Sequence, residues 1–118
     1  MLLSLSFPAN LPFAQELWSF NPSEVILKVK EPLLVMIGKK DIQVDWRVDG
    51  KALEAATAKE SFASFVYPEN ADHVLKYEEK PRDNLTAENS LRYNAQERII
   101  DPEAKDAIYS WLIKRTSK

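Results

Sequence analysis

The sequence predicts an α/β fold in which short parallel strands are flanked by helices. Two short apolar runs, Leu33 to Ile37 and Ser64 to Tyr67, each end at a residue that interrupts a strand, Gly38 in the first case and a proline in the second. Between them, Val48 to Glu60 has helical spacing. A strand, a helix and a second strand within about 35 residues are typical of a βαβ unit, whose two strands pair in parallel.

The first strand is predicted from a run without polar residues, Leu33 to Ile37. A continuous apolar run is typical of a strand covered on both faces, as strands of parallel sheets usually are. A buried helix would give the same run, but the proline before it and the glycine after it favour a strand. We therefore expect this strand to be buried.

The helix ahead of this strand has a clear start. Asn21 is a good N-cap, Pro22 suits the first helical position, and Glu24 places an acid in the first turn. The helix must end before Pro32, because the residue before a proline avoids the helical conformation. The helix between the strands presents a stripe of small apolar residues, which comprises Ala52, Leu53, Ala56 and Ala58.

The last helix is predicted to begin after Asp101, which repeats the N-cap signature ahead of Pro102 and Glu103. One face of it is apolar and comprises Ala104, Ala107, Ile108, Trp111 and Leu112. We expect Trp111 and Leu112 to lie in the core.

A polar stretch from Lys76 to Ile100 separates the second strand from the last helix, and a short helix is expected near residues 85–93. Its first charged residues are expected to form a solvated face, and they are Lys76, Glu78, Glu79 and Lys80.

Length and composition indicate one domain of 118 residues, with an apolar, helical segment at 1–20 and the α/β unit at 21–118. The formal net charge is −2 and basic residues are not clustered, which argues against nucleic-acid binding. Without cysteine there is no disulfide, thiolate nucleophile or cysteine metal site, and a reducing cytoplasm is compatible. No run approaches the roughly 20 apolar residues of a membrane helix, so we expect a cytoplasmic protein without a membrane partner.

Two candidate catalytic residues follow the predicted strands, Asp41 after the first and His73 after the second. Ligands and catalytic groups of open α/β sheets collect outside the carboxyl ends of the strands. Adjacent parallel strands lie about 4.8 Å apart, so the two loops can bring these side chains within hydrogen-bond reach. A carboxylate that accepts the Nδ1 proton of an imidazole fixes its tautomer and stabilises the imidazolium, as in a hydrolytic triad. His73 is the only histidine, so the general base of such a pair must be this residue.

Other interpretations of these residues remain open at this point. His73 can be a surface or capping histidine, and Asp41 can be a turn former after Gly38. Asp45 is an alternative acid. A metal site made of Asp41, Asp45 and His73 is chemically possible, although no spacing rule supports it. Trp46 and its neighbour Arg47 are interpreted as part of a solvated loop rather than a pocket wall.

Three segments, "PLLVMIGKKDIQVDW", "FVYPENADHVLK" and "YNAQERIIDPEAKDAIYSWL", resemble the carboxyl-terminal part of an α/β-hydrolase-fold serine hydrolase. In that family the acid lies in a G-x-x-D loop, the histidine lies in a loop after the last strand, and a terminal helix follows. The resemblance runs from about Asn21 to Leu112 and implies a partial α/β-hydrolase-like βαβ unit. It also implies that Asp41 is the triad acid and His73 the general base, with no cofactor and no metal.

The sequence departs from that family at the nucleophile, which the family carries in a G-x-S-x-G elbow upstream of the acid. The only glycines are Gly38 and Gly50, so the elbow is absent from this chain. The serines before Asp41 lie on no strand–turn–helix pattern, and they are Ser4, Ser6, Ser19 and Ser23. The expected function is therefore that of a truncated or partial serine hydrolase of the esterase or lipase type, inactive alone.

The predicted sheet indicates a protein partner, because two parallel strands leave an unpaired edge that another strand or chain must cover. We expect a homo-oligomer or a complementary chain, and a small-molecule ester as possible substrate. The alternative function is a non-catalytic, oligomeric binding or assembly module on a hydrolase-derived scaffold. A weaker third option is a small-molecule binder that uses the vestigial pocket.

Overall fold

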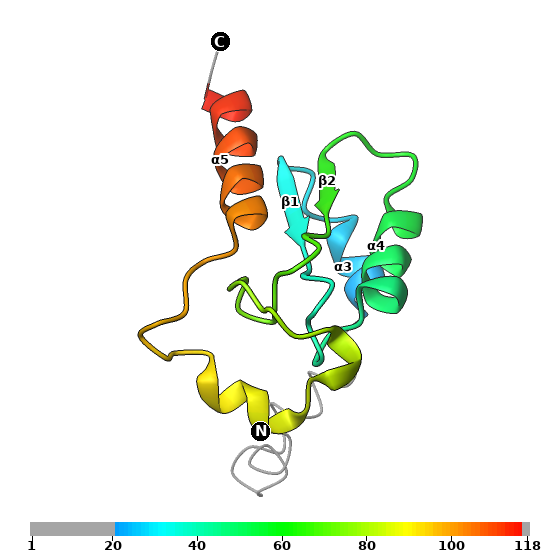
Figure 1. Ribbon diagram of the computed structural model, residues 1–118. Helices are drawn as coiled ribbons and strands as arrows, with labels where there is room; N and C mark the ends of the chain where they lie inside the picture. Colours follow the sequence, from blue (N-terminus) through cyan, green and yellow to red (C-terminus); the bar gives the residue numbers. More distant parts are fainter. Residues whose placement is uncertain (1–20, 117–118) are drawn as a thin grey trace, which may run out of the picture.

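Two short parallel strands, β1 (Leu33–Met36) and β2 (Ala63–Val66), form the sheet of the computed structural model, which describes residues 21–116. Leu33 pairs with Ala63, and the register continues to Met36 and Val66. The parallel pairing of these two runs confirms the predicted strand–helix–strand unit (Figure 1). The expectation of a helical segment at 1–20 lies outside the described residues.

Within residues 21–116 three α-helices accompany the sheet, namely α3 (Pro22–Ile26), α4 (Lys51–Ala56) and α5 (Pro102–Thr116). Helix α5 contacts β1, and α3 packs against α4. Figure 1 shows α5 on the β1 side of the sheet and α4 on the other side. None of the helices between residues 21 and 116 has the length and apolar character needed to cross a membrane.

Both predicted helix starts are confirmed. The Asn21 side chain accepts a hydrogen bond from the backbone N–H of Ser23 at 3.0 Å, and Pro22 opens the helix. Asp101 accepts from the backbone N–H of Ala104 at 2.9 Å through its Oδ2 atom. These caps satisfy amide groups that have no partner inside the helix.

The first two helices are shorter than the sequence pattern indicates. Helix α3 ends at Ile26, and Lys30 adopts a φ of 56°, which turns the chain toward β1. The predicted helix from Val48 to Glu60 is divided into a π-helical turn, Trp46–Gly50, and α4. Thr57 closes α4 because its hydroxyl donates to the carbonyl oxygen of Leu53.

The prediction that the first strand is buried is wrong. Every residue of β1 and β2 is only half-buried, because the helices described at residues 21–116 do not cover both faces of the sheet completely. The buried apolar residues among those described are Ile26, Pro68, Ala71 and Ala104.

The prediction that Trp111 and Leu112 of the last helix lie in the core is also wrong. Leu112 is 48% exposed, and Trp111 is half-buried with the Arg115 guanidinium over its ring. Only Ala104 of α5 is buried, and Ala107, Ile108 and Trp111 on the same face are half-buried.

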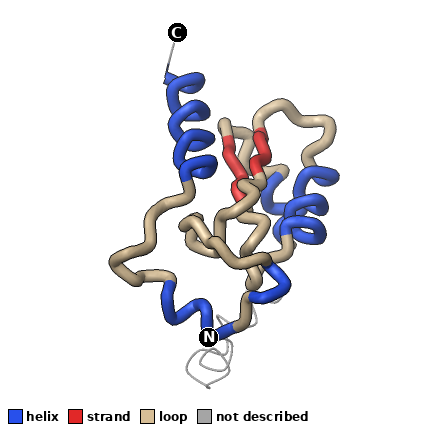
Figure 2. The backbone as a smooth tube through the Cα atoms, viewed as in Figure 1, coloured by secondary structure: helices blue, strands red, loops and turns tan. Residues whose placement is uncertain are grey.

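Residues 76–100 form a long loop that leaves the sheet and returns to α5, with two short helical turns (Figure 2). The expected helix near residues 85–93 is a 3₁₀ turn, Ala87–Arg92, and a second 3₁₀ turn covers Arg82–Asn84. The ends of the loop meet, because Lys76 and Ile100 form an antiparallel bridge. Two members of the expected solvated face, Lys76 and Glu78, are half-buried, and the Lys76 ammonium donates to the carbonyl oxygen of Tyr93.

Candidate functional site

Asp41 and His73 meet at the carboxyl end of the two-stranded sheet. The Nδ1 atom of His73 lies 3.0 Å from Oδ2 and 3.1 Å from Oδ1 of Asp41. The Asp41 side chain is 6% exposed, whereas the His73 imidazole remains partly open to solvent. A carboxylate at this distance favours the tautomer with the proton on Nδ1, which leaves the Nε2 lone pair free.

Backbone groups hold the Asp41 carboxylate in place. Its Oδ1 atom accepts hydrogen bonds from the N–H groups of Gln43 at 2.8 Å and Val44 at 2.9 Å. Its own N–H donates to the carbonyl oxygen of Gly38, and its carbonyl oxygen accepts from Arg82 Nε at 3.2 Å. The acid is thus fixed by a turn directly after β1, which is the local behaviour expected of aspartate after a glycine.

The two loops are joined where Gly38 touches Ala71. The N–H of Lys40 donates to the carbonyl oxygen of Ala71 at 3.0 Å, and that of Lys39 donates to the carbonyl oxygen of Pro68 at 2.9 Å. A Cβ atom on Gly38 would lie 2.5 Å from the carbonyl carbon of Ala71 and closer still to its oxygen. Glycine is therefore required by close approach of the backbone, and this approach brings the acid loop to the histidine loop.

Asp72 shapes the loop that carries His73. Its Oδ1 atom accepts from the N–H groups of Val74 at 3.0 Å and Lys76 at 2.9 Å. Its N–H donates to the carbonyl oxygen of Lys76, and Leu75 takes a φ of 63° at the tip. The Asp72 carboxylate thus closes a tight turn that contains His73.

Tyr93 is a neighbour of His73 that sequence reasoning missed. The centres of the two rings are 6.0 Å apart, and the Tyr93 hydroxyl accepts from Nε2 of Gln43 at 3.2 Å. Burial raises the pKa of the Tyr93 hydroxyl, and the charges of Asp72 and Asp41 add to the effect. Gln43 also lines a cavity of about 440 Å³ beside the acid loop, together with Ile42, Leu85, Thr86, Ala87 and Ser90. No local signal marks Tyr93, because it lies 20 residues beyond the histidine in an irregular loop.

Asp45, the alternative acid, does not contact His73. It caps the π-helical turn and binds Arg47 with both carboxylate oxygens at 3.0 Å. The hydrogen bond from Arg47 lowers the pKa of the Asp45 carboxyl. The metal site composed of Asp41, Asp45 and His73 is not formed either, and among residues 21–116 no group of three or more potential ligands is placed to hold a metal ion.

Trp46 packs rather than being solvated. Its ring centre is 5.1 Å from that of Tyr67, and the Lys39 ammonium lies 4.7 Å from the Trp46 ring centre. Arg47 remains exposed, as expected. The side chain of Trp46 therefore packs against Tyr67, the residue that follows β2.

No nucleophile accompanies the pair within the described residues. There, His73 forms side-chain hydrogen bonds with Asp41 alone. Ser23 lies in the first turn of α3 and only its backbone N–H is engaged, in the Asn21 cap. Ser4, Ser6 and Ser19 lie outside the described residues.

No family model, curated protein or solved structure matches this chain.

Proposed function

We propose that this chain supplies the acid and the base of a serine-hydrolase triad, Asp41 and His73, for cleavage of an ester bond. One observation carries the proposal, namely the 3.0 Å contact between His73 Nδ1 and a buried Asp41 carboxylate at the carboxyl ends of two paired parallel strands. This is the relation between acid and histidine that a triad needs. The nucleophile comes from a segment outside the described residues or from a complementary chain.

The chemistry assigned to each residue follows from the geometry. Asp41 holds the imidazole in the Nδ1–H tautomer, so Nε2 can accept the proton of an attacking hydroxyl as its oxygen bonds to the ester carbonyl carbon. Asp41 stabilises the imidazolium that forms. Nε2 then returns the proton to the leaving alcohol as the carbon–oxygen bond breaks.

The isolated chain is expected to be inactive toward esters, because among the described residues no serine or threonine hydroxyl forms a hydrogen bond with His73. We expect its rate with p-nitrophenyl esters to equal that of the His73→Ala variant. Steady-state assays of both proteins at equal concentration measure this. Turnover by the wild-type chain that disappears in His73→Ala would show that a nucleophile is already present.

The same assay with a complementary segment tests the function itself. Co-expression with an adjacent reading frame that carries G-x-S-x-G is expected to give hydrolysis that needs both polypeptides and is lost with His73→Ala. Equal hydrolysis with wild-type chain and His73→Ala would refute the proposal.

A second candidate function, an oligomeric assembly module, is favoured by the uncovered apolar residues of α5. Tyr109 is 67% exposed, Leu112 48% and Ile113 46%, and they lie on one face of the helix. Monomeric proteins seldom leave large apolar side chains gathered in this way. In this interpretation the α5 face, together with the free edge of the sheet, joins copies of the chain.

Sedimentation velocity tests this alternative with Leu112→Glu, which places a charge on the α5 face. We expect the wild-type chain to self-associate as its concentration rises, and the variant to remain monomeric over the same range. Ser110→Glu, at an exposed position on a different face of the same helix, adds the same single negative charge and is the control for charge alone. A wild-type chain that is monomeric at all concentrations would rule out this function.

A further inference from the structure

Arg98 forms a buried ion pair with the residue directly before the candidate general base. Its Nη1 atom lies 2.7 Å from Oδ2 of Asp72. The side chains are 9% and 4% exposed, and the contact is an ion pair without the alignment of a hydrogen bond. The two residues are 26 positions apart, so the pair connects the histidine loop to the segment that leads into α5.

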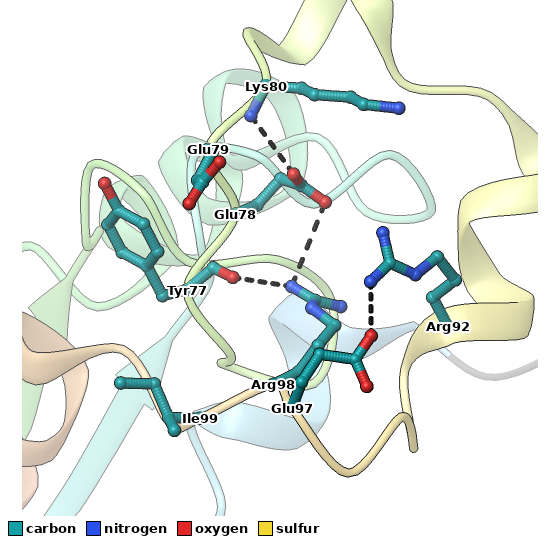
Figure 3. Close-up of a pocket in the computed structure, with 8 residues that line it drawn as sticks. All are labelled: Tyr77, Glu78, Glu79, Lys80, Arg92, Glu97, Arg98 and Ile99. Atoms are coloured by element: carbon teal, nitrogen blue, oxygen red, sulfur yellow. Dashed lines mark hydrogen bonds and ion pairs between the residues drawn. The ribbon is translucent and has the colours of Figure 1, made fainter.

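The guanidinium also holds the outgoing side of the histidine loop. Its Nη2 atom donates to the carbonyl oxygen of Tyr77 at 2.7 Å and lies 3.9 Å from a carboxylate oxygen of Glu78 (Figure 3). Asp72 and Tyr77 lie on either side of His73 in the sequence. One planar cation therefore attaches to both ends of the turn that presents the imidazole, which a guanidinium does better than a single ammonium.

Two consecutive residues of the histidine loop each make a polar side-chain contact at the site. Asp72 faces Arg98, and His73 faces Asp41. Asp72 also accepts two backbone N–H groups of the loop through its other oxygen. A shift of this carboxylate therefore moves the backbone of the histidine. Because a buried charge is costly without its partner, the Arg98–Asp72 pair persists as long as the loop keeps this shape.

We propose that Arg98 is a positioning residue of the site. Through Asp72 and the carbonyl oxygen of Tyr77, it keeps the imidazole of His73 where its Nδ1–H donates to Asp41. The inference rests on the proposed function, in which that hydrogen bond prepares His73 as the base.

The sole histidine makes a direct test possible, because a nitrogen NMR spectrum of the full chain contains one imidazole. In the wild-type chain we expect the Nδ1–H tautomer and slow exchange of that proton with water. In Arg98→Lys, which keeps the charge beside Asp72 but cannot reach both partners, we expect mixed tautomers. We also expect exchange about tenfold faster or more, the equivalent of one charge-assisted hydrogen bond. Arg98→Gln is expected to have a larger effect or to unfold.

Arg92→Gln is the matched control, because Arg92 lies on the same loop and pairs with Glu97 at 2.6 Å on the surface (Figure 3). It is expected to leave the His73 signals unchanged. A folded Arg98→Lys variant with wild-type tautomer and exchange would overturn the positioning role and leave the proposed function intact, as would an equal effect in Arg92→Gln. A wild-type chain without the Nδ1–H tautomer would overturn the proposed function as well.

Discussion

Replacement of Gly38 by alanine is expected to separate the loops that carry Asp41 and His73. The new Cβ atom would collide with the backbone of Ala71, which cannot rotate away as a side chain can. We expect the free energy of unfolding to fall by about 3 kcal/mol, the upper end of the usual cost of overpacking. Urea unfolding measures that loss, and the imidazole NMR signals of His73 report loss of the contact with Asp41.

Gly50→Ala is the control, since the Cβ atom there would lie 2.6 Å from the ring of Tyr67, a side chain that can move. The expected loss of stability is smaller, and the His73 signals should be unchanged. A Gly38→Ala variant with wild-type stability and an intact Asp41–His73 contact would show that close approach at Ala71 does not hold the loops together.

Asp41→Asn is expected to invert the tautomer of His73. The asparagine oxygen can still accept the N–H groups of Gln43 and Val44, so the acid loop keeps its turn. The amide NH₂ then faces Nδ1 of His73 and can only donate, which moves the ring proton to Nε2 and removes the base. Nitrogen NMR detects this change in the isolated chain. In the complemented hydrolase we expect kcat to fall by about 10⁴-fold, as in other triads with the wrong tautomer.

Asp45→Asn is the matched control, because Asp45 lies four residues away and binds Arg47 instead. We expect it to leave the tautomer and the complemented activity at wild-type values. If Asp45→Asn changes the tautomer and Asp41→Asn does not, the assignment of the acid is wrong.

Local sequence signals were sufficient for the strands, the helix starts and the candidate pair. Two apolar runs, one ended by Gly38 and one by the proline after Tyr67, correctly predicted the two strands. The N-cap residues Asn21 and Asp101 correctly predicted two helix starts. Parallel pairing of adjacent strands then placed Asp41 beside His73. Each of these inferences depends on neighbouring residues or on the fixed spacing of a parallel sheet.

Burial could not be predicted in the same way. The apolar run of β1 and the apolar face of α5 both indicated core positions, yet β1 is half-buried and Leu112 is exposed. An apolar pattern shows which face of an element can be covered, but the amount of cover depends on how many other elements reach it.

The sequence by itself determined the α/β class, the order of the elements and the identity of the only possible imidazole base, because these depend on local propensity and composition. Only the tertiary structure showed that Asp41, and not Asp45, forms a hydrogen bond with His73, and only it brought Tyr93 and Arg98 to the histidine loop. The physical reason is that these contacts join residues far apart in the sequence. They depend on the close backbone approach at Gly38 and on a buried ion pair, and neither leaves a periodic pattern in the sequence.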